Sequence, residues 1–185
     1  MNLTELKILD WIQGTFGCGP MDKLMPVVSF LGNVGIFWII IAVAMMISRK
    51  YRKYGFQMAA ALIICVLVGN LIIKNIVMRS RPCWINESFA LLIKNPPDYS
   101  FPSGHTTSSF AAAFAAAKAD KKIGVVSYIV AMMIAFSRMY LYVHFPTDIL
   151  GGVVLGTLIA FLVCRAAADE NFMKKIKKPF VKAEK

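Results

Sequence analysis

The sequence is poor in charged residues, and the acidic ones are the scarcer kind, with 10 Asp and Glu against 21 Lys and Arg. Charged types make up 17% of the 185 residues and hydrophobic types 58%, and the mean hydropathy is +0.62. Soluble domains carry about 25% charged residues, so this composition argues against an ordinary cytosolic enzyme. It also excludes a disordered chain, because disorder requires low hydrophobicity. The length fits a single domain.

The sequence also lacks the usual patterns of zinc sites, disulfides and secretion signals. The four cysteines stand at positions 18, 65, 83 and 164 without C-x-x-C spacing, and two of them lie in apolar runs. This pattern supports neither a zinc site nor a disulfide framework. The N-terminus carries acidic residues and lacks the continuous apolar stretch of a secretory signal peptide. We therefore expect the membrane segments themselves to direct insertion.

Apolar segments that could cross a membrane fill most of the chain. A transmembrane helix takes about 20 mostly apolar residues. Three segments are long enough, over residues 55–78, 123–143 and 145–164. Residues 33–48 are apolar but slightly short, and residues 105–117 are short and alanine-rich, as suits a helix packed inside a bundle. We expect both of these to span as well.

Two further helices are expected before these spans. Residues 21–31 have the length of half a membrane helix, and the sequence leaves open whether they span. Residues 4–16 carry apolar side chains at helical spacing, which predicts an amphipathic helix at the membrane interface. The expected fold is all-α, a polytopic membrane helix bundle with about six transmembrane helices. Its expected parts are an N-terminal interfacial helix (1–20), a membrane-embedded domain (21–168) and a basic cytoplasmic tail (169–185).

Basic residues predict how the bundle lies in the plasma membrane. They cluster after alternate spans, at residues 49–53, at 118–122 and from Arg165 into the tail. The positive-inside rule makes these clusters and the C-terminus cytoplasmic. They account for the formal charge of +11, so we expect no nucleic-acid partner. The opposite, extracytoplasmic side nevertheless keeps five cations: Lys74, Arg79, Arg81, Lys94 and Arg138.

Two of these cations form a first polar cluster, K-x6-R-P, which comprises Lys74, Arg81 and Pro82. Seven residues make about two helical turns, so Lys74 and Arg81 can share one face about 10 Å apart before Pro82 ends the helix. The simpler interpretation is a lysine that reaches the interface and an arginine in a loop.

A second cluster, P-S-G-H, occupies residues 102–105. Ser103 suits a helix N-cap, and Gly104 lets an anion approach the backbone N–H groups of the helix start. By itself, a serine cap next to His105 is more often structural than functional.

The third cluster, S-R-x5-H-x3-D, contains Arg138, His144 and Asp148. We expect Phe145 to cap a helix with Pro146 in its first turn, so that Asp148 reaches back to the His144 ring. A carboxylate on one imidazole nitrogen leaves the other nitrogen free as a nucleophile or base. A lone pair of this kind is more often a structural hydrogen bond.

All three clusters fall on the extracytoplasmic side of a topology that was assigned without them, and so ordered a combination is improbable by chance. In this order they resemble the three signature motifs of the type 2 phosphatidic acid phosphatase (PAP2) family, the membrane relatives of vanadium haloperoxidases. The resemblance runs from Lys74 to Asp148 without departure from the family pattern. It implies an integral membrane lipid phosphatase, and the topology assigned from the basic residues turns its active site to the extracytoplasmic side.

The resemblance also implies a role for each motif residue. His144 attacks phosphorus and forms a phosphohistidine, while Asp148 orients its ring. His105 protonates the leaving oxygen and later activates water. No cluster of metal-binding residues accompanies this pair, so we expect neither a metal nor another cofactor. The phosphoryl oxygens are held by cations and hydrogen-bond donors, as phosphoryl transfer requires: Lys74, Arg81, Ser103, Gly104 and Arg138.

The expected partners are the lipid bilayer and a lipid phosphate or diphosphate within it, while the sequence does not define an oligomeric state. Family substrates include undecaprenyl diphosphate, phosphatidic acid and phosphatidylglycerol phosphate, and residues 83–101 are the expected lid or head-group selector. Two alternatives use the same residues. A lipid phosphotransferase would pass the phosphoryl group to an acceptor other than water, and an anion transporter would line its pathway with intramembrane cations. Transporters usually contain repeated halves, and no such repeat is apparent in this sequence.

Overall fold

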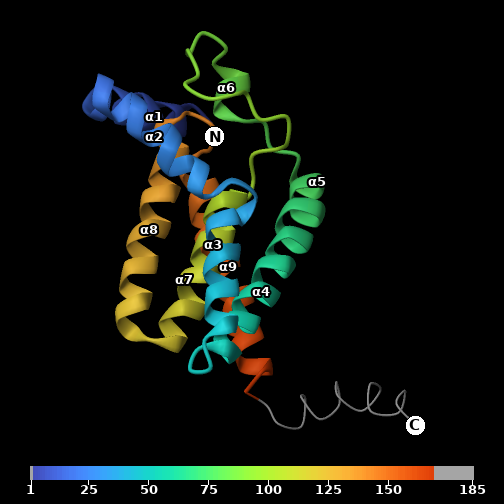
Figure 1. Cartoon of the computed structure of the whole chain (residues 1–185). Coiled ribbons are helices and arrows are strands. Elements are labelled where there is room, and N and C mark those ends of the chain that lie inside the picture. The colour runs from blue at the N-terminus through green and yellow to red at the C-terminus, as the bar shows by residue number, and fades with distance from the viewer. Residues whose placement is uncertain (1, 169–185) are drawn as a thin grey trace.

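The structure is a computed structural model that describes residues 2–168, and the tail expected at 169–185 lies outside them. Within this range every regular element is a helix, which confirms the all-α class (Figure 1). In chain order the elements are α1 (Asn2–Phe16), α2 (Gly19–Leu31), the 3-10 helix η1 (Asn33–Gly35), α3 (Ile36–Ile47), α4 (Arg52–Cys65), the π-helix η2 (Val66–Ile73), α5 (Lys74–Val77), α6 (Pro82–Ile85), α7 (Gly104–Ala119), α8 (Lys121–Tyr140) and α9 (Pro146–Ala166).

Several of these helices suit a membrane. Three stretches are long and apolar enough to cross it, over Arg52–Ile85, Lys121–Tyr140 and Pro146–Ala166. The bent pair Gly19–Leu31 and Asn33–Ile47 passes the same test across a 45° bend. Length and composition therefore give three or four spans in the described part of the chain, and the expected count of about six is not confirmed.

Helix α7 lies at the centre of the bundle, where it packs against α4, α8 and α9. With 16 residues it is shorter than a full span. Its buried face is made of small residues: Ala111, Ala112, Ala113, Ala115 and Ala116. Gly156 of α9 approaches it so closely that a Cβ there would lie 2.1 Å from the Thr107 carbonyl oxygen. Small residues on both helices thus allow the backbone contact that membrane bundles use.

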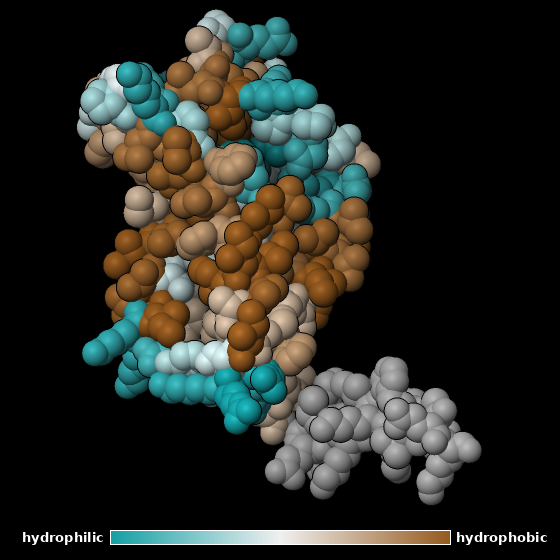
Figure 2. Space-filling model, in the orientation of Figure 1, coloured by the Kyte–Doolittle hydropathy of each residue, from teal (hydrophilic) through white to brown (hydrophobic). Residues whose placement is uncertain are grey.

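The outer surface carries a broad apolar band between two polar ends (Figure 2). Large apolar side chains are more than half exposed on four helices: Ile40 of α3, Ile63 of α4, Val125 of α8 and Val154 of α9. An exposed apolar area of this extent suits hydrocarbon and not water. This surface agrees with an integral membrane protein.

The polar clusters of the sequence all lie at one end of the bundle. That end carries α6, its loop and the turn from α8 to α9, together with α1 and α2 (Figure 1). The turns from α3 to α4 and from α7 to α8, with the basic residues 49–53 and 118–122, lie at the other end. The predicted separation of the two sets of cations is therefore present in the fold.

Candidate active site

The predicted site residues converge at the end of the bundle that carries α6. Ser103 and Asp148 are fully buried, and the Ser103 N–H donates a 3.2 Å hydrogen bond to the Asp148 carbonyl. The other six line one cavity of about 980 Å³: Lys74, Arg81, Gly104, His105, Arg138 and His144. Residues that are up to 74 positions apart in the sequence thus share one site.

Three of the cations that line this cavity are buried, with 5%, 2% and 4% of Lys74, Arg81 and Arg138 exposed. Buried charges are costly unless they are paired, so a cluster of like charges calls for an anion. The Nε of Arg138 is buried and has no hydrogen-bond partner among the residues that the structure describes. It therefore has a donor left for an anionic ligand.

His144 is held in a form that can act as a nucleophile. Its Nε2 lies 3.1 Å from Nη1 of Arg81, and this Nη1 also donates to the Val143 carbonyl at 2.7 Å. A guanidinium can only donate, so Nε2 keeps its lone pair and the proton sits on Nδ1. Burial, followed by the charges of Arg81 and Arg138, lowers the pKa of His144 well below its usual value. The imidazole is thus neutral, and its Nε2 lone pair accepts the Arg81 N–H at the wall of the cavity.

Asp148 lies behind His144, but it has closer partners than the imidazole. Its Oδ2 is 3.5 Å from Nδ1 of His144, so the expected pair is present as a long contact. The same Oδ2 accepts the Phe145 N–H at 2.8 Å, which caps the start of α9, and the Ser100 hydroxyl. Oδ1 accepts from Nη1 of Arg79 at 2.7 Å. Sequence reasoning missed Ser100 and Arg79 as partners, although it noted the cation at position 79.

Asp98 of the loop after α6 closes the other side of the site. Its carboxylate forms ion pairs with Lys74 and with Nη2 of Arg81, the latter at 2.8 Å. Burial alone would raise the pKa of Asp98, but the hydrogen bond from Lys74 and the charge of Arg81 outweigh it and lower the pKa to about 2. The expected lid loop is therefore tied to two of the cations that are expected to bind phosphate, and the sequence spacing did not reveal this contact.

The start of α7 forms the floor of the site. The Ser103 side chain caps the helix by accepting the Thr106 N–H at 3.4 Å and the Thr106 hydroxyl at 3.0 Å. A Cβ at position 104 would lie 2.7 Å from Oδ1 of Asn70, so the glycine keeps room at the helix end. Backbone N–H groups at a helix N-terminus attract anions.

Helix α2 and the break after it supply two further contacts that the sequence motifs did not indicate. Ser29 of α2 accepts a hydrogen bond from Nη1 of Arg138. The break places Oδ1 of Asn33 2.8 Å from Nε2 of His105. Val34 and Gly35 have φ of 53° and 68° here, a left-handed conformation that is unusual for a β-branched valine. The bend between α2 and α3 thus positions the second histidine.

No group of three His, Cys, Asp or Glu side chains within residues 2–168 has an arrangement that could hold a metal ion.

Comparison with known proteins identifies the family. The sequence model of the PAP2 superfamily matches residues 50–172. The chain belongs to this superfamily. An undecaprenyl-diphosphatase from Sulfolobus acidocaldarius is 32% identical over 163 residues, which are 87% of this chain and 76% of the relative.

Solved structures agree with this membership. A PAP2-type phosphatidylglycerolphosphate phosphatase from Bacillus subtilis matches with a TM-score of 0.71 and 28% identity, covering 94% of this chain and 86% of its own. A bacterial vanadium-dependent iodoperoxidase shares the fold, with a TM-score of 0.64 and 19% identity over 88% of this chain and 48% of its own. The resemblance inferred from the three motifs is thus confirmed, and this PAP2 protein is a phosphatase of the membrane.

Proposed function

We propose that this PAP2 protein hydrolyses a lipid phosphate or diphosphate at the extracytoplasmic membrane face, through a phosphohistidine on His144. The observation that carries the proposal is the composition of the 980 Å³ cavity. One part holds the three buried cations and both histidines, and the other is lined by apolar side chains of α3 and α4, among them Ile39, Val43, Leu62 and Ile63. A phosphate head group joined to an apolar chain matches both parts.

In the first step Nε2 of His144 attacks phosphorus, and the bond from phosphorus to the leaving oxygen breaks. His105 gives its proton to that oxygen. Lys74, Arg81 and Arg138, with the Ser103 hydroxyl and the Gly104 N–H, bind the three equatorial oxygens, whose charge must be stabilised during transfer.

In the second step water attacks the phosphohistidine, and His105 takes the proton of that water. The bond from phosphorus to Nε2 breaks, and inorganic phosphate leaves with His144 restored. Asp148 and Ser100 face Nδ1 throughout and hold the tautomer that exposes Nε2.

The relatives support the substrate class. The similar proteins include enzymes named undecaprenyl-diphosphatase and phosphatidylglycerophosphatase B. We infer that a polyprenyl diphosphate such as undecaprenyl diphosphate is the first substrate to test, followed by phosphatidylglycerol phosphate and phosphatidic acid.

The orientation rests on charge. The basic residues 49–53 and 118–122 lie at the end of the bundle opposite the cations and histidines of the cavity. By the positive-inside rule this opposite end is cytoplasmic, which turns the cavity towards the extracytoplasmic face.

The proposal is tested by phosphate release from the three lipids in detergent micelles that contain EDTA. We expect release without any divalent ion from at least one lipid, and a loss of about 10³-fold or more in His144→Ala, because the nucleophile is gone. Arg49→Ala, at the opposite end of the bundle, is the control that keeps activity. No release from any lipid by folded protein, or equal release by His144→Ala, would contradict the proposal.

A further inference from the structure

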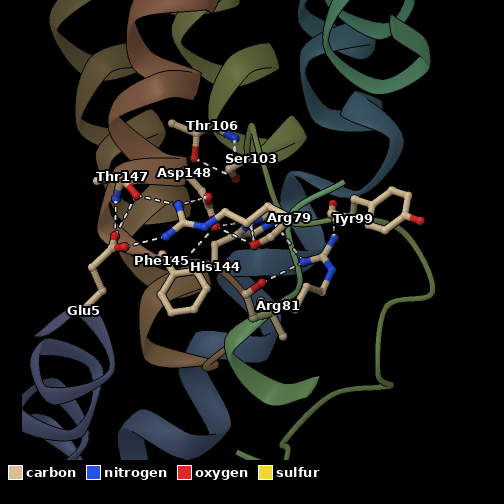
Figure 3. A network of polar contacts seen from close by, with 12 residues as sticks. Glu5, Arg79, Arg81, Tyr99, Ser103, Thr106, His144, Phe145, Thr147 and Asp148 are labelled. Atoms are coloured by element: carbon tan, nitrogen blue, oxygen red, sulfur yellow. Dashed lines mark hydrogen bonds and ion pairs between the residues drawn. The ribbon is translucent and has the colours of Figure 1, made fainter. Parts of the chain in front are cut away.

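A row of buried charges connects the N-terminal helix to the carboxylate behind His144 (Figure 3). The guanidinium of Arg79 lies between two carboxylates and pairs with Glu5 through Nη2 and with Asp148 through Nη1, the latter at 2.7 Å. Only 15%, 11% and 0% of the Arg79, Glu5 and Asp148 side chains are exposed. None of the steps proposed above uses Glu5 or Arg79.

Both members of the Glu5–Arg79 pair have a second anchor. The other oxygen of Glu5 accepts the Thr147 N–H at 3.1 Å and the Thr147 hydroxyl at 2.6 Å, so it caps the start of α9. A carboxylate is favoured at a helix N-terminus. Arg79 lies over the Phe145 ring, with Cζ 4.2 Å from the ring centroid. The pair is therefore fixed to the turn that carries His144 and to the first turn of α9.

Stability alone is a weak reason for such a network. Desolvation of buried ion pairs offsets most of their attraction, and apolar residues of similar volume often stabilise a fold as well. The network does have a specific geometric effect, because it places a positive charge on the far side of Asp148 from the imidazole. The two oxygens of Asp148 are thereby assigned, Oδ1 to Arg79 and Oδ2 to the His144 side.

We propose that Glu5 and Arg79 are positioning residues for the reaction, which hold Asp148 so that His144 keeps a neutral ring with Nε2 towards the substrate. This inference rests on the proposed role of His144 as the nucleophile. Arg79 neutralises Asp148, and Glu5 in turn limits how strongly Arg79 does so. The N-terminal helix α1, which precedes the part matched by the family model, is thus a part of the site.

The charges around His144 allow the effect of Arg79 to be distinguished from the effect of Glu5. Arg81, Arg138 and Lys74 lower the pKa of His144, and Asp98 raises it. Asp148 of α9 and His105 of α7 complete the titratable surroundings. Loss of the Arg79 charge leaves Asp148 uncompensated, so the pKa of His144 must rise. Loss of the Glu5 charge strengthens Arg79, so the pKa must fall.

The chain contains two histidines, which makes this effect directly measurable. The experiment is an NMR titration of ¹⁵N-labelled histidine in the full chain in detergent, with His105→Asn to assign the signals. Arg79→Gln should move the titration of His144 up by about one pH unit, and Glu5→Gln should move it down. Arg79→Lys keeps the charge and should stay near the wild type. Lys7→Gln, on the exposed side of α1, is the control for a charge lost from that helix.

Kinetics on the best lipid substrate provide the second readout. Arg79→Gln and Arg79→Lys should lower kcat roughly tenfold to hundredfold with KM nearly unchanged, because the forked geometry is lost while the phosphate-binding cations remain. A shift of His144 in the same direction for Arg79→Gln and Glu5→Gln, or no shift in either, would overturn the inference.

Failure of this inference and failure of the proposed function are distinguishable. A wild-type chain that releases phosphate, with His144 titrating alike in all variants, would remove the positioning role alone. A chain that releases no phosphate from any lipid would remove the function, and the catalytic role of the pair with it. If Arg79→Gln does not fold, the other two variants still test the inference. Arg79→Lys should lower kcat with little change in the titration of His144, and Glu5→Gln should move that titration down.

Discussion

His144 faces the cavity with an unprotonated Nε2, because the neighbouring Arg81 can only donate to it. Burial and the surrounding cations keep the ring neutral, and Ser100 and Asp148 lie on its other nitrogen. A neutral imidazole beside fixed cations is what nucleophilic attack on a phosphate requires. At the scale of single residues, the site therefore depends on which atoms donate and which accept.

Asp98 gives a prediction at this scale, because its carboxylate binds two of the cations that we propose as phosphate ligands. Asp98→Asn should lower KM, and should tighten inhibition by inorganic phosphate, by up to about fivefold, since ion pairs with exposed members are worth about 0–1 kcal/mol. Steady-state kinetics measure both effects. Glu87→Gln, an exposed acidic residue of the same loop, is the matched control. A weaker affinity for phosphate in Asp98→Asn would show that the carboxylate helps binding instead.

The pH dependence of this ion pair follows from the lowered pKa of Asp98. In the folded chain the pKa of Asp98 is about 2, below its usual value near 3.8. The ion pairs of the carboxylate are therefore fully present above pH 3.8 and are lost only as the pH falls towards 2. Phosphate inhibition of the wild type relative to Asp98→Asn should therefore stay constant from pH 5 to 9 once the ionisation of phosphate itself is taken into account. A change in this ratio within the range would contradict the assignment.

The motif residues could be predicted from the sequence because each lies in a recognisable local pattern, such as the capped start of α7 at Ser103. Their supporting residues could not. Glu5, Ser29, Asn33 and Ser100 leave no pattern around themselves, since their partners are 44 to 142 residues away. Long-range polar contacts depend on helix packing, which a single sequence does not specify.

The break between α2 and α3 is the element on which the second histidine depends. Residues 21–31 and 33–48 were predicted as separate helices, and the structure joins them across a 45° bend with Asn33 at its corner. The expected span over residues 55–78 begins and ends close to that prediction but contains the π-helix η2 just before Lys74. A uniformly apolar run does not reveal such a change of helical period, and π-helical turns are frequent at functional sites.

Gly32 at this break gives a prediction at the element scale. A Cβ at position 32 would lie 2.5 Å from Cδ2 of His105 and 3.0 Å from Ile134, so Gly32→Ala must displace the imidazole. We expect kcat to fall by at least about tenfold, because small misplacements of a reacting group are costly. Gly19→Ala, at the start of α2 with nothing within 4 Å of the added Cβ, should keep full activity. The midpoint of thermal unfolding should differ little between Gly32→Ala and Gly19→Ala. If Gly32→Ala keeps activity within twofold of the wild type, the break between α2 and α3 does not position His105.

At the scale of the whole molecule, the buried cations and histidines lie at one end of an apolar bundle and the basic turns lie at the other (Figures 1 and 2). The bundle, the membrane setting and the family were predictable because apolar length and ordered motifs are local properties of the sequence. The division into parts at residues 20 and 168, and the cytoplasmic tail, remain predictions. The number of spans depends on whether α7 and the bent pair of α2 and α3 cross the membrane. The packing of the bundle decides this, and the hydropathy of these helices does not.

The central claim is that His144 carries the phosphoryl group between the two steps. The most direct measurement is a rapid quench into alkali of the full chain turning over undecaprenyl diphosphate labelled with ³²P in its terminal phosphate, since phosphohistidine survives alkali. We predict a label that mass spectrometry places on His144, that appears within the first turnover and that His144→Ala lacks. Normal phosphate release with no label on His144 at any quench time, or a label on another residue, would contradict the claim.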